Sequence, residues 1–139
     1  MISKGDYLGV YAKCSDITPA IEANIYRLLT KVNALLQAAI LAKVPLPVNM
    51  KTRNQISGDA NGGFRPQDCK VGAPNSNHKQ GLAVDIYDPV ESLDNFVNDS
   101  KQAKLIEGLG LYFEHKDYTK GWCHVQIVPP KSGKRFFIP

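Results

Sequence analysis

Long apolar runs are missing from this sequence, and cysteine is scarce. Nothing in its 139 residues approaches the roughly 18 consecutive apolar residues that indicate a membrane-spanning helix. The cysteines, Cys14, Cys69 and Cys123, are odd in number and widely spaced. This pattern argues against a disulfide framework and fits a reducing compartment, so we expect three free thiols. The length and the ordinary apolar fraction indicate one domain over residues 1–139, which we expect to be monomeric.

A secretory signal is also missing, because residues 1–16 have neither an apolar centre nor a small-residue cleavage site. We therefore expect the chain to remain in the cytoplasm where it is made, without a membrane partner. The formal net charge is +4, with no long block of one sign. A basic surface attracts nucleic acid, anionic lipid or an acidic polymer such as bacterial cell wall, and it can also be merely solvated. No aromatic interleaving or helix motif supports nucleic-acid binding. The basic excess lies late in the chain, in Lys116, Lys120, Lys131, Lys134 and Arg135.

Apolar spacing predicts the elements. Residues at steps of three and four predict an amphipathic helix from Pro19, capped by Thr18, to about Lys43. A second helical stretch follows Asp88 and Pro89, breaks near residues 98–100 and closes at Gly108 and Gly110. Alternating or β-branched runs predict strands, and the order of elements predicts an α+β fold with a small, mostly antiparallel sheet. The expected strands are 83–87, 111–114 and 123–128.

A long irregular segment, residues 54–77, precedes the first expected strand. Such a stretch inside a compact domain is uncommon and is usually either disordered or functional. It brings His78 to the start of the strand that contains Asp85. A carboxylate among apolar neighbours loses hydration and needs a partner.

Two histidines and one aspartate form a candidate metal site: His78, Asp85 and His124. Catalytic zinc typically takes three such ligands and keeps a fourth position for water, and the cation would compensate the charge of Asp85. Each residue also has a plain structural interpretation, as a surface histidine, a hydrogen-bonded edge aspartate and a core histidine. Cys123 adjoins His124, but neighbouring side chains on a strand point to opposite faces, so Cys123 is expected in the core.

The pattern S-x-H-x-x-G-x-A-x-D at residues 76–85, followed by W-x-H-x-Q at residues 122–126, resembles a known family. It is similar to the zinc D-alanyl-D-alanine carboxypeptidases and L-alanyl-D-glutamate endopeptidases, whose fold the hedgehog signalling domain shares. The likeness covers roughly residues 54–130 and is greatest to the phage-encoded branch. It implies a hedgehog-like fold with the long helix and a second helix packed on the sheet. It also implies Zn²⁺ bound by the three residues named above.

The same resemblance implies roles for residues around the metal. Arg65, in GGFRP, would stabilise charge on the scissile carbonyl oxygen, although it can equally be a surface arginine after a turn. Gln126 shares the strand face of His124 and would contact either that histidine or the substrate. Ser76 would hydrogen bond within the loop and hold His78 in place. Ser76, Trp122 and Gln126 are the expected substrate-binding residues.

The general base is the point at which the sequence departs from the family. Many relatives have an acidic residue three positions before the last histidine, where this chain has Gly121. Glu114, His115 and Asp117 are the alternatives, all three of which can also be solvated loop residues. Glu114 is favoured because it ends an expected strand similar to one in the hedgehog domain.

The implied function is hydrolysis of peptide bonds involving D-amino acids in peptidoglycan stem peptides, by a carboxypeptidase or an endolysin-type endopeptidase. A phage lysin of this kind would reach the cell wall after a separate pore-forming protein releases it at lysis. The alternative is a zinc-bound but catalytically silent binding or structural module of the same fold, for which Gly121 is the evidence.

Overall fold

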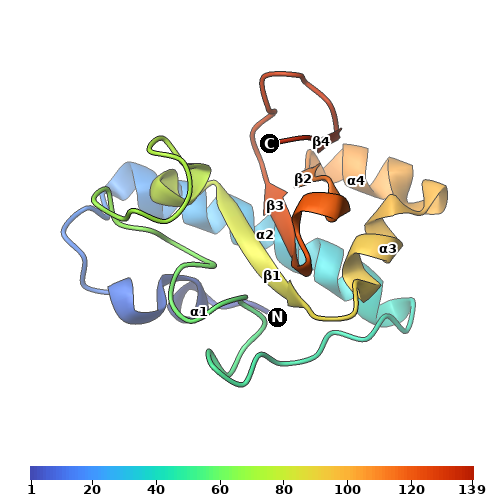
Figure 1. Ribbon diagram of the computed structural model, residues 1–139, viewed down its shortest axis with the longest axis horizontal. Coiled ribbons are helices and arrows are strands. Elements are labelled where there is room, and N and C mark those ends of the chain that lie inside the picture. The colour runs from blue at the N-terminus through green and yellow to red at the C-terminus, as the bar shows by residue number, and fades with distance from the viewer.

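The computed structural model describes all residues 1–139 (Figure 1). None of its helices has the length and apolarity needed to cross a membrane. The three cysteines are free, as expected. The helices and strands, in chain order, are α1 (Lys4–Leu8), α2 (Pro19–Leu41), β1 (Ala83–Asp88), α3 (Ser92–Asn98), α4 (Ala103–Leu109), β2 (Tyr112–Glu114), β3 (Gly121–Gln126) and β4 (Phe136–Phe137), joined by the short 3-10 turns η1 (Gly9–Tyr11), η2 (Asn77–Gln80), η3 (Ser100–Gln102) and η4 (Lys116–Tyr118).

The long helix α2 confirms the sequence prediction. The Thr18 side chain accepts a hydrogen bond from the Ile21 backbone N–H, and Pro19 occupies the first helical position, where its missing N–H is no loss. The helix ends two residues before the predicted limit, and Ile40, which the spacing of three and four residues also places on the apolar face, is exposed. The buried stripe consists of Ile21, Ile25, Leu28, Leu29, Val32, Leu35, Leu36 and Ala39.

The sheet has the strand order β1-β3-β2-β4. β3 pairs antiparallel with both β1 and β2, and Asp85 of β1 lies directly opposite His124 of β3. β4 pairs parallel with β2, so the sheet is mixed and gains a strand that was not predicted. The α+β prediction is confirmed. In Figure 1, α2 passes behind β1 and β3, and its buried residues join one core cluster with Val84, Ile86 and Val125 of these strands.

The second helical stretch is confirmed as two short helices with the expected break. Both carboxylate oxygens of Asp88 accept backbone hydrogen bonds, from Leu93 and Asp94, and so start α3. Asp99 ends α3 and accepts a hydrogen bond from Lys101 in η3. Gly110, in the left-handed region, closes α4. In Figure 1, α3 and α4 lie on the opposite side of the molecule from the loop that contains residues 54–77.

The long irregular segment covers the free edge of β1. The Ser57 N–H donates to the Asp85 carbonyl at 2.9 Å, and the Asp85 N–H donates to the Gly62 carbonyl at 2.7 Å. Farther along, the Tyr87 N–H donates to the Gln55 carbonyl at 2.8 Å. Backbone groups of β1 that β3 does not pair are thereby satisfied, and the loop is fixed next to Asp85.

Candidate metal centre

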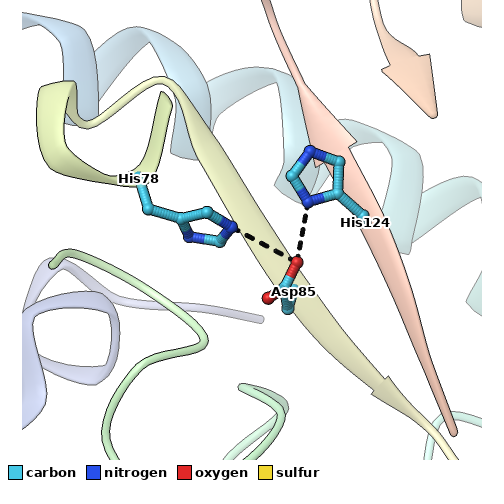
Figure 2. A group of neighbouring side chains, drawn as sticks. All are labelled: His78, Asp85 and His124. Carbon is cyan, nitrogen blue, oxygen red and sulfur yellow. Dashed lines mark hydrogen bonds and ion pairs between the residues drawn. The ribbon is translucent and has the colours of Figure 1, made fainter. Parts of the chain in front are cut away.

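Three elements bring the predicted ligands together. His78 lies in η2, Asp85 in the middle of β1 and His124 opposite it in β3. One nitrogen of each imidazole and a carboxylate oxygen lie within 4.8 Å of one another, a group that could hold a metal ion. Figure 2 shows both rings turned toward the Asp85 carboxylate. His78 is 2% exposed, and Asp85 and His124 are each 9% exposed, so none of the three is a surface residue.

Hydrogen bonds on the far side of each ring fix its tautomer. The Nδ1–H of His78 donates to the Gly63 carbonyl at 2.8 Å, and the Nε2–H of His124 donates to Gln126 Oε1 at 3.0 Å. Gln126 Nε2 in turn donates to the Val128 carbonyl at 2.7 Å, which orients the amide. In the neutral imidazoles the remaining nitrogens therefore carry lone pairs. Metal-binding histidines are commonly oriented in this way.

Both remaining nitrogens face the same carboxylate oxygen. His78 Nε2 lies 3.4 Å and His124 Nδ1 2.8 Å from Asp85 Oδ1. Three electron-rich atoms in buried surroundings repel one another unless protons or a cation lie between them. The donor set therefore fits a divalent cation.

Charges at the candidate centre shift the pKa values of its acid and of one of its bases in opposite directions. Burial alone raises the pKa of Asp85, but the charges and hydrogen bonds of His78 and His124 outweigh it and hold the pKa well below its ordinary value. Burial alone lowers the pKa of His124, but its hydrogen bond to Asp85 and the Asp85 charge reverse the effect and raise it. The carboxylate is thus ionised and ready to bind a cation across the usual pH range.

Arg65 holds the second oxygen of Asp85. Its Nη2 donates to Asp85 Oδ2 at 3.1 Å, its Nε to the Asn61 carbonyl at 2.7 Å and its Nη1 to the Val71 carbonyl at 3.3 Å. Because an arginine has five N–H donors, two remain for a bound molecule. The surface alternative is thus wrong, since Arg65 is 8% exposed. Its predicted role at a carbonyl oxygen stays a prediction.

A cavity of about 430 Å³ opens beside the three ligands. Ser76 also has the expected local contact, because its hydroxyl accepts a hydrogen bond from the His78 N–H at 3.3 Å. Most residues predicted for the site therefore meet at one place. Besides His78, Asp85 and His124, the predicted residues that line this cavity are Arg65, Ser76, Glu114, Trp122 and Gln126.

Glu114 differs from the other two candidates for the general base. It lies at the end of β2, lines the cavity and has no hydrogen-bond or ion-pair partner. Burial raises its pKa, with the His124 charge opposing and the Asp85 charge adding to the effect. His115 and Asp117 lie outside the cavity, and the Asp117 N–H donates to His115 Nδ1 at 3.2 Å. The structure therefore does not bring these two residues to the centre.

Gly121, at the family's usual acidic position, has a φ of 95° and does not line the cavity. No atom lies within 4 Å of where its Cβ would be, so backbone conformation rather than crowding favours glycine here.

Two supporting residues were not predicted. A Cβ on Gly63 would lie 2.0 Å from the Tyr7 carbonyl oxygen, so only glycine lets this backbone approach Tyr7 and accept from His78. The Lys79 ammonium is buried and donates to the Gln67 and Pro74 carbonyls at 2.8 and 3.1 Å. These two hydrogen bonds hold together the irregular segment that precedes His78. The two adjacent glycines, Gly62 and Gly63, are a sequence signal that could have identified Gly63. Nothing in the sequence distinguishes Lys79 from a surface lysine.

Comparisons of the chain with family models, curated proteins and solved structures gave no match. A function for the chain therefore rests on the chemistry of the centre and on the two motifs at residues 76–85 and 122–126.

Proposed function

We propose that this protein is a zinc-dependent peptidase that hydrolyses peptide bonds involving D-amino acids in peptidoglycan stem peptides, on a hedgehog-like fold. The observation that carries the proposal is the pair of oriented histidines facing Asp85 beside a cavity that also contains the unpaired carboxylate of Glu114. The substrate class rests on the sequence resemblance, and metal-assisted hydrolysis rests on this geometry.

Zinc fits the donor set better than the other common cations. Two imidazoles and one carboxylate are typical of catalytic zinc sites, which keep a fourth position for water, whereas calcium and magnesium take mainly oxygen ligands. The buried Cys123 is in the core, as expected, and does not line the cavity. When bound, zinc lowers the pKa of a coordinated water to about 7 and polarises a carbonyl oxygen.

The residues of the chain supply proton transfer and orientation. The Glu114 carboxylate accepts a proton from the attacking water and passes it to the leaving amine, which a carboxylate with a raised pKa does more readily. The two free N–H groups of Arg65 donate to the carbonyl oxygen of the scissile bond. Gln126 and the Gly63 carbonyl keep the imidazoles in the tautomers that bind the metal.

Most of the late basic residues keep a charge that can attract an anionic wall. Only Lys120 has a carboxylate partner, Glu91 at 2.9 Å, whereas Lys116 donates to the neutral amide of Asn95 and Arg135 donates to the Leu111 carbonyl. Lys116, Lys131, Lys134 and Arg135 have no ion-pair partner, so they are the residues that would favour approach to an anionic wall. Release from a phage-infected cell by a pore-forming protein remains part of the proposal.

Glu114→Gln tests the proposal because it removes the proton acceptor and keeps the shape. The variant should bind as much zinc as the unmodified protein and lose about 10²–10⁴-fold in hydrolysis of purified peptidoglycan, measured as new amino groups. Asp117→Asn, outside the cavity, is the matched control and should keep both properties. Full hydrolysis by Glu114→Gln would contradict the role of Glu114.

The second candidate function is a zinc-bound but catalytically silent module. The specific observation in its favour is Gly121, whose positive φ disfavours the acidic residue usual at that position. Stoichiometric zinc in the unmodified protein without any release of amino groups from peptidoglycan would establish this alternative.

A further inference from the structure

The cavity beside the metal centre does not end there. A second cavity, of about 330 Å³, lies next to it and is lined by the loop at residues 57–62. The two cavities share four lining residues, Arg65, Val71, Asp85 and Trp122. One of the four, Asp85, is a proposed metal ligand, so the two cavities adjoin each other at the candidate centre.

The two arms of this cleft come from different parts of the chain. One arm is bounded by Gly72, Ala73, Asn75 and Ser76, on the segment that leads into η2. The other is bounded by the loop at residues 57–62, which hydrogen bonds along the free edge of β1. A chain lying across Trp122 could extend into both arms, with a bond in its interior near the centre.

The cleft also has little with which to recognise a terminal carboxylate. Arg65 is the only lysine or arginine that lines either cavity, and Asp85 neutralises its charge at 3.1 Å. Glu114 lines one arm and Asp59 the other, so both arms carry a carboxylate. Lys51 pairs with Asp59 at 3.3 Å but does not line the cavity. A substrate carboxylate in either arm would thus lose hydration without gaining a cationic side chain as a partner, and only a bound metal ion would attract it.

From the two-armed cleft and the absence of a free cationic side chain in it we infer that the protein is an endopeptidase, which cuts inside a peptide and does not remove a carboxyl-terminal residue. This inference rests on the proposed function. It selects as substrate a peptide that continues on both sides of the scissile bond.

The test compares a stem pentapeptide ending in D-alanyl-D-alanine with the same peptide amidated at its carboxyl terminus, using the zinc-loaded protein. Mass spectrometry should find an internal cut in both, with kcat/KM values within about twofold. Release of D-alanine alone, with the amide cut more than tenfold more slowly, would overturn the inference while leaving the proposed function intact. No product from either peptide or from peptidoglycan would overturn the proposed function, and the inference with it.

Blocking each arm gives a second readout. Ala60→Trp fills the arm at residues 57–62 and Ala73→Trp fills the other, since each alanine lines only one cavity. Both variants should bind one zinc, which shows that the centre is formed, and both should lose at least tenfold in kcat/KM on peptidoglycan. Ala23→Trp, exposed on α2, is the control and should lose nothing. Unchanged hydrolysis by either zinc-loaded cleft variant would contradict the use of both arms.

Discussion

At the scale of single residues, the geometry of the candidate metal centre depends on atoms that are not themselves candidate ligands. Gln126 accepts the Nε2–H of His124 and anchors its own amide on the Val128 carbonyl. The sequence placed Gln126 on the face of His124 and left open whether it contacts the histidine or the substrate. In the structure Gln126 contacts His124, and Gln126 also lines the cavity.

Gln126→Leu removes the acceptor and keeps the approximate volume. Because the ring of His124 is then free to adopt the other tautomer, zinc affinity should fall about 10–100-fold. Competition with a chromophoric chelator measures this. Gln37→Leu, on an exposed face of α2, is the control and should leave the affinity unchanged. Equal affinities in the two variants would show that Gln126 does not orient the ligand.

Another residue, Asp94 in α3, is buried with little compensation. It is 1% exposed, and its carboxylate has no N–H or O–H donor, only the weakly donating thiol of Cys123 beside it. Burial raises its pKa from 3.8 to about 6, with the Cys123 thiol opposing and the Asp88 charge adding to the effect. Since the folded protein holds this proton more tightly than the unfolded chain, the contribution of Asp94 to stability falls between pH 3.8 and about 6 and stays low above.

Asp94→Asn should therefore raise the free energy of unfolding at pH 7 by about 2 kcal/mol and change it little at pH 4. Urea unfolding at both pH values measures the difference, and comparison with the exposed Asp68→Asn separates it from a general charge effect. A gain that is equal at the two pH values would rule out titration of Asp94 as its cause.

At the scale of elements, the short turn η2 carries His78. Gly81 ends this turn and packs directly against α2. Gly81 has a φ of 70°, and a Cβ there would lie 2.7 Å from Ile25 Cγ1 and 3.1 Å from the Ile21 carbonyl oxygen. The glycine of the ten-residue motif is thus required by conformation and by contact with the long helix.

Gly81→Ala should lower the free energy of unfolding by about 2 kcal/mol, because it combines a strained backbone with a close contact. Gly108→Ala is the matched control, since Gly108 is in α4 and nothing lies within 4 Å of its Cβ position. That variant should be stabilised by about 0.5–1 kcal/mol. Chemical denaturation compares the two, and a neutral Gly81→Ala would remove the proposed reason for glycine.

Helices and strands with capping residues or a periodic apolar pattern were predictable from the sequence. Short elements without such a pattern were not. The caps of α2 and the break between α3 and α4 follow from local rules on Thr18, Pro19 and Asp99, which act within a few residues. β4 was missed because a two-residue strand has no period and exists only through its pairing with β2. α1 was missed although Ser3 and Asp6 form a capping box, because the helix has only 5 residues.

The site divides in the same way. The three ligands were predictable because histidine and aspartate at motif spacing carry chemistry in their identity. Among Glu114, His115 and Asp117 the sequence favoured Glu114 only through its likeness to a strand of the hedgehog domain, and the structure shows that Glu114 alone of the three lines the cavity, because the chain turns away after β2. The route past the centre depends on the loop at residues 57–62, whose position is set by backbone hydrogen bonds to β1, a pairing that no side-chain pattern in the loop indicates.

At the scale of the whole molecule, stability and function lie in separate regions. A cluster of 23 buried hydrophobic residues joins α2 to the back of β1 and β3, whereas the candidate ligands lie on the opposite face of these strands. The register between β1 and β3 connects the two, because it sets Asp85 against His124 while Ile86 and Cys123 enter the core. The core can therefore hold the ligands in place before a metal binds.

The most direct test of this account is the zinc content of the purified protein and of two histidine variants, measured by elemental analysis after exposure to equimolar zinc. The unmodified protein and His115→Ala, which changes the histidine outside the cavity, should each bind one zinc per chain. His78→Ala should bind none and remain folded. Full zinc retention in a folded His78→Ala protein, or no zinc in the unmodified protein, would contradict the metal centre on which the proposed function depends.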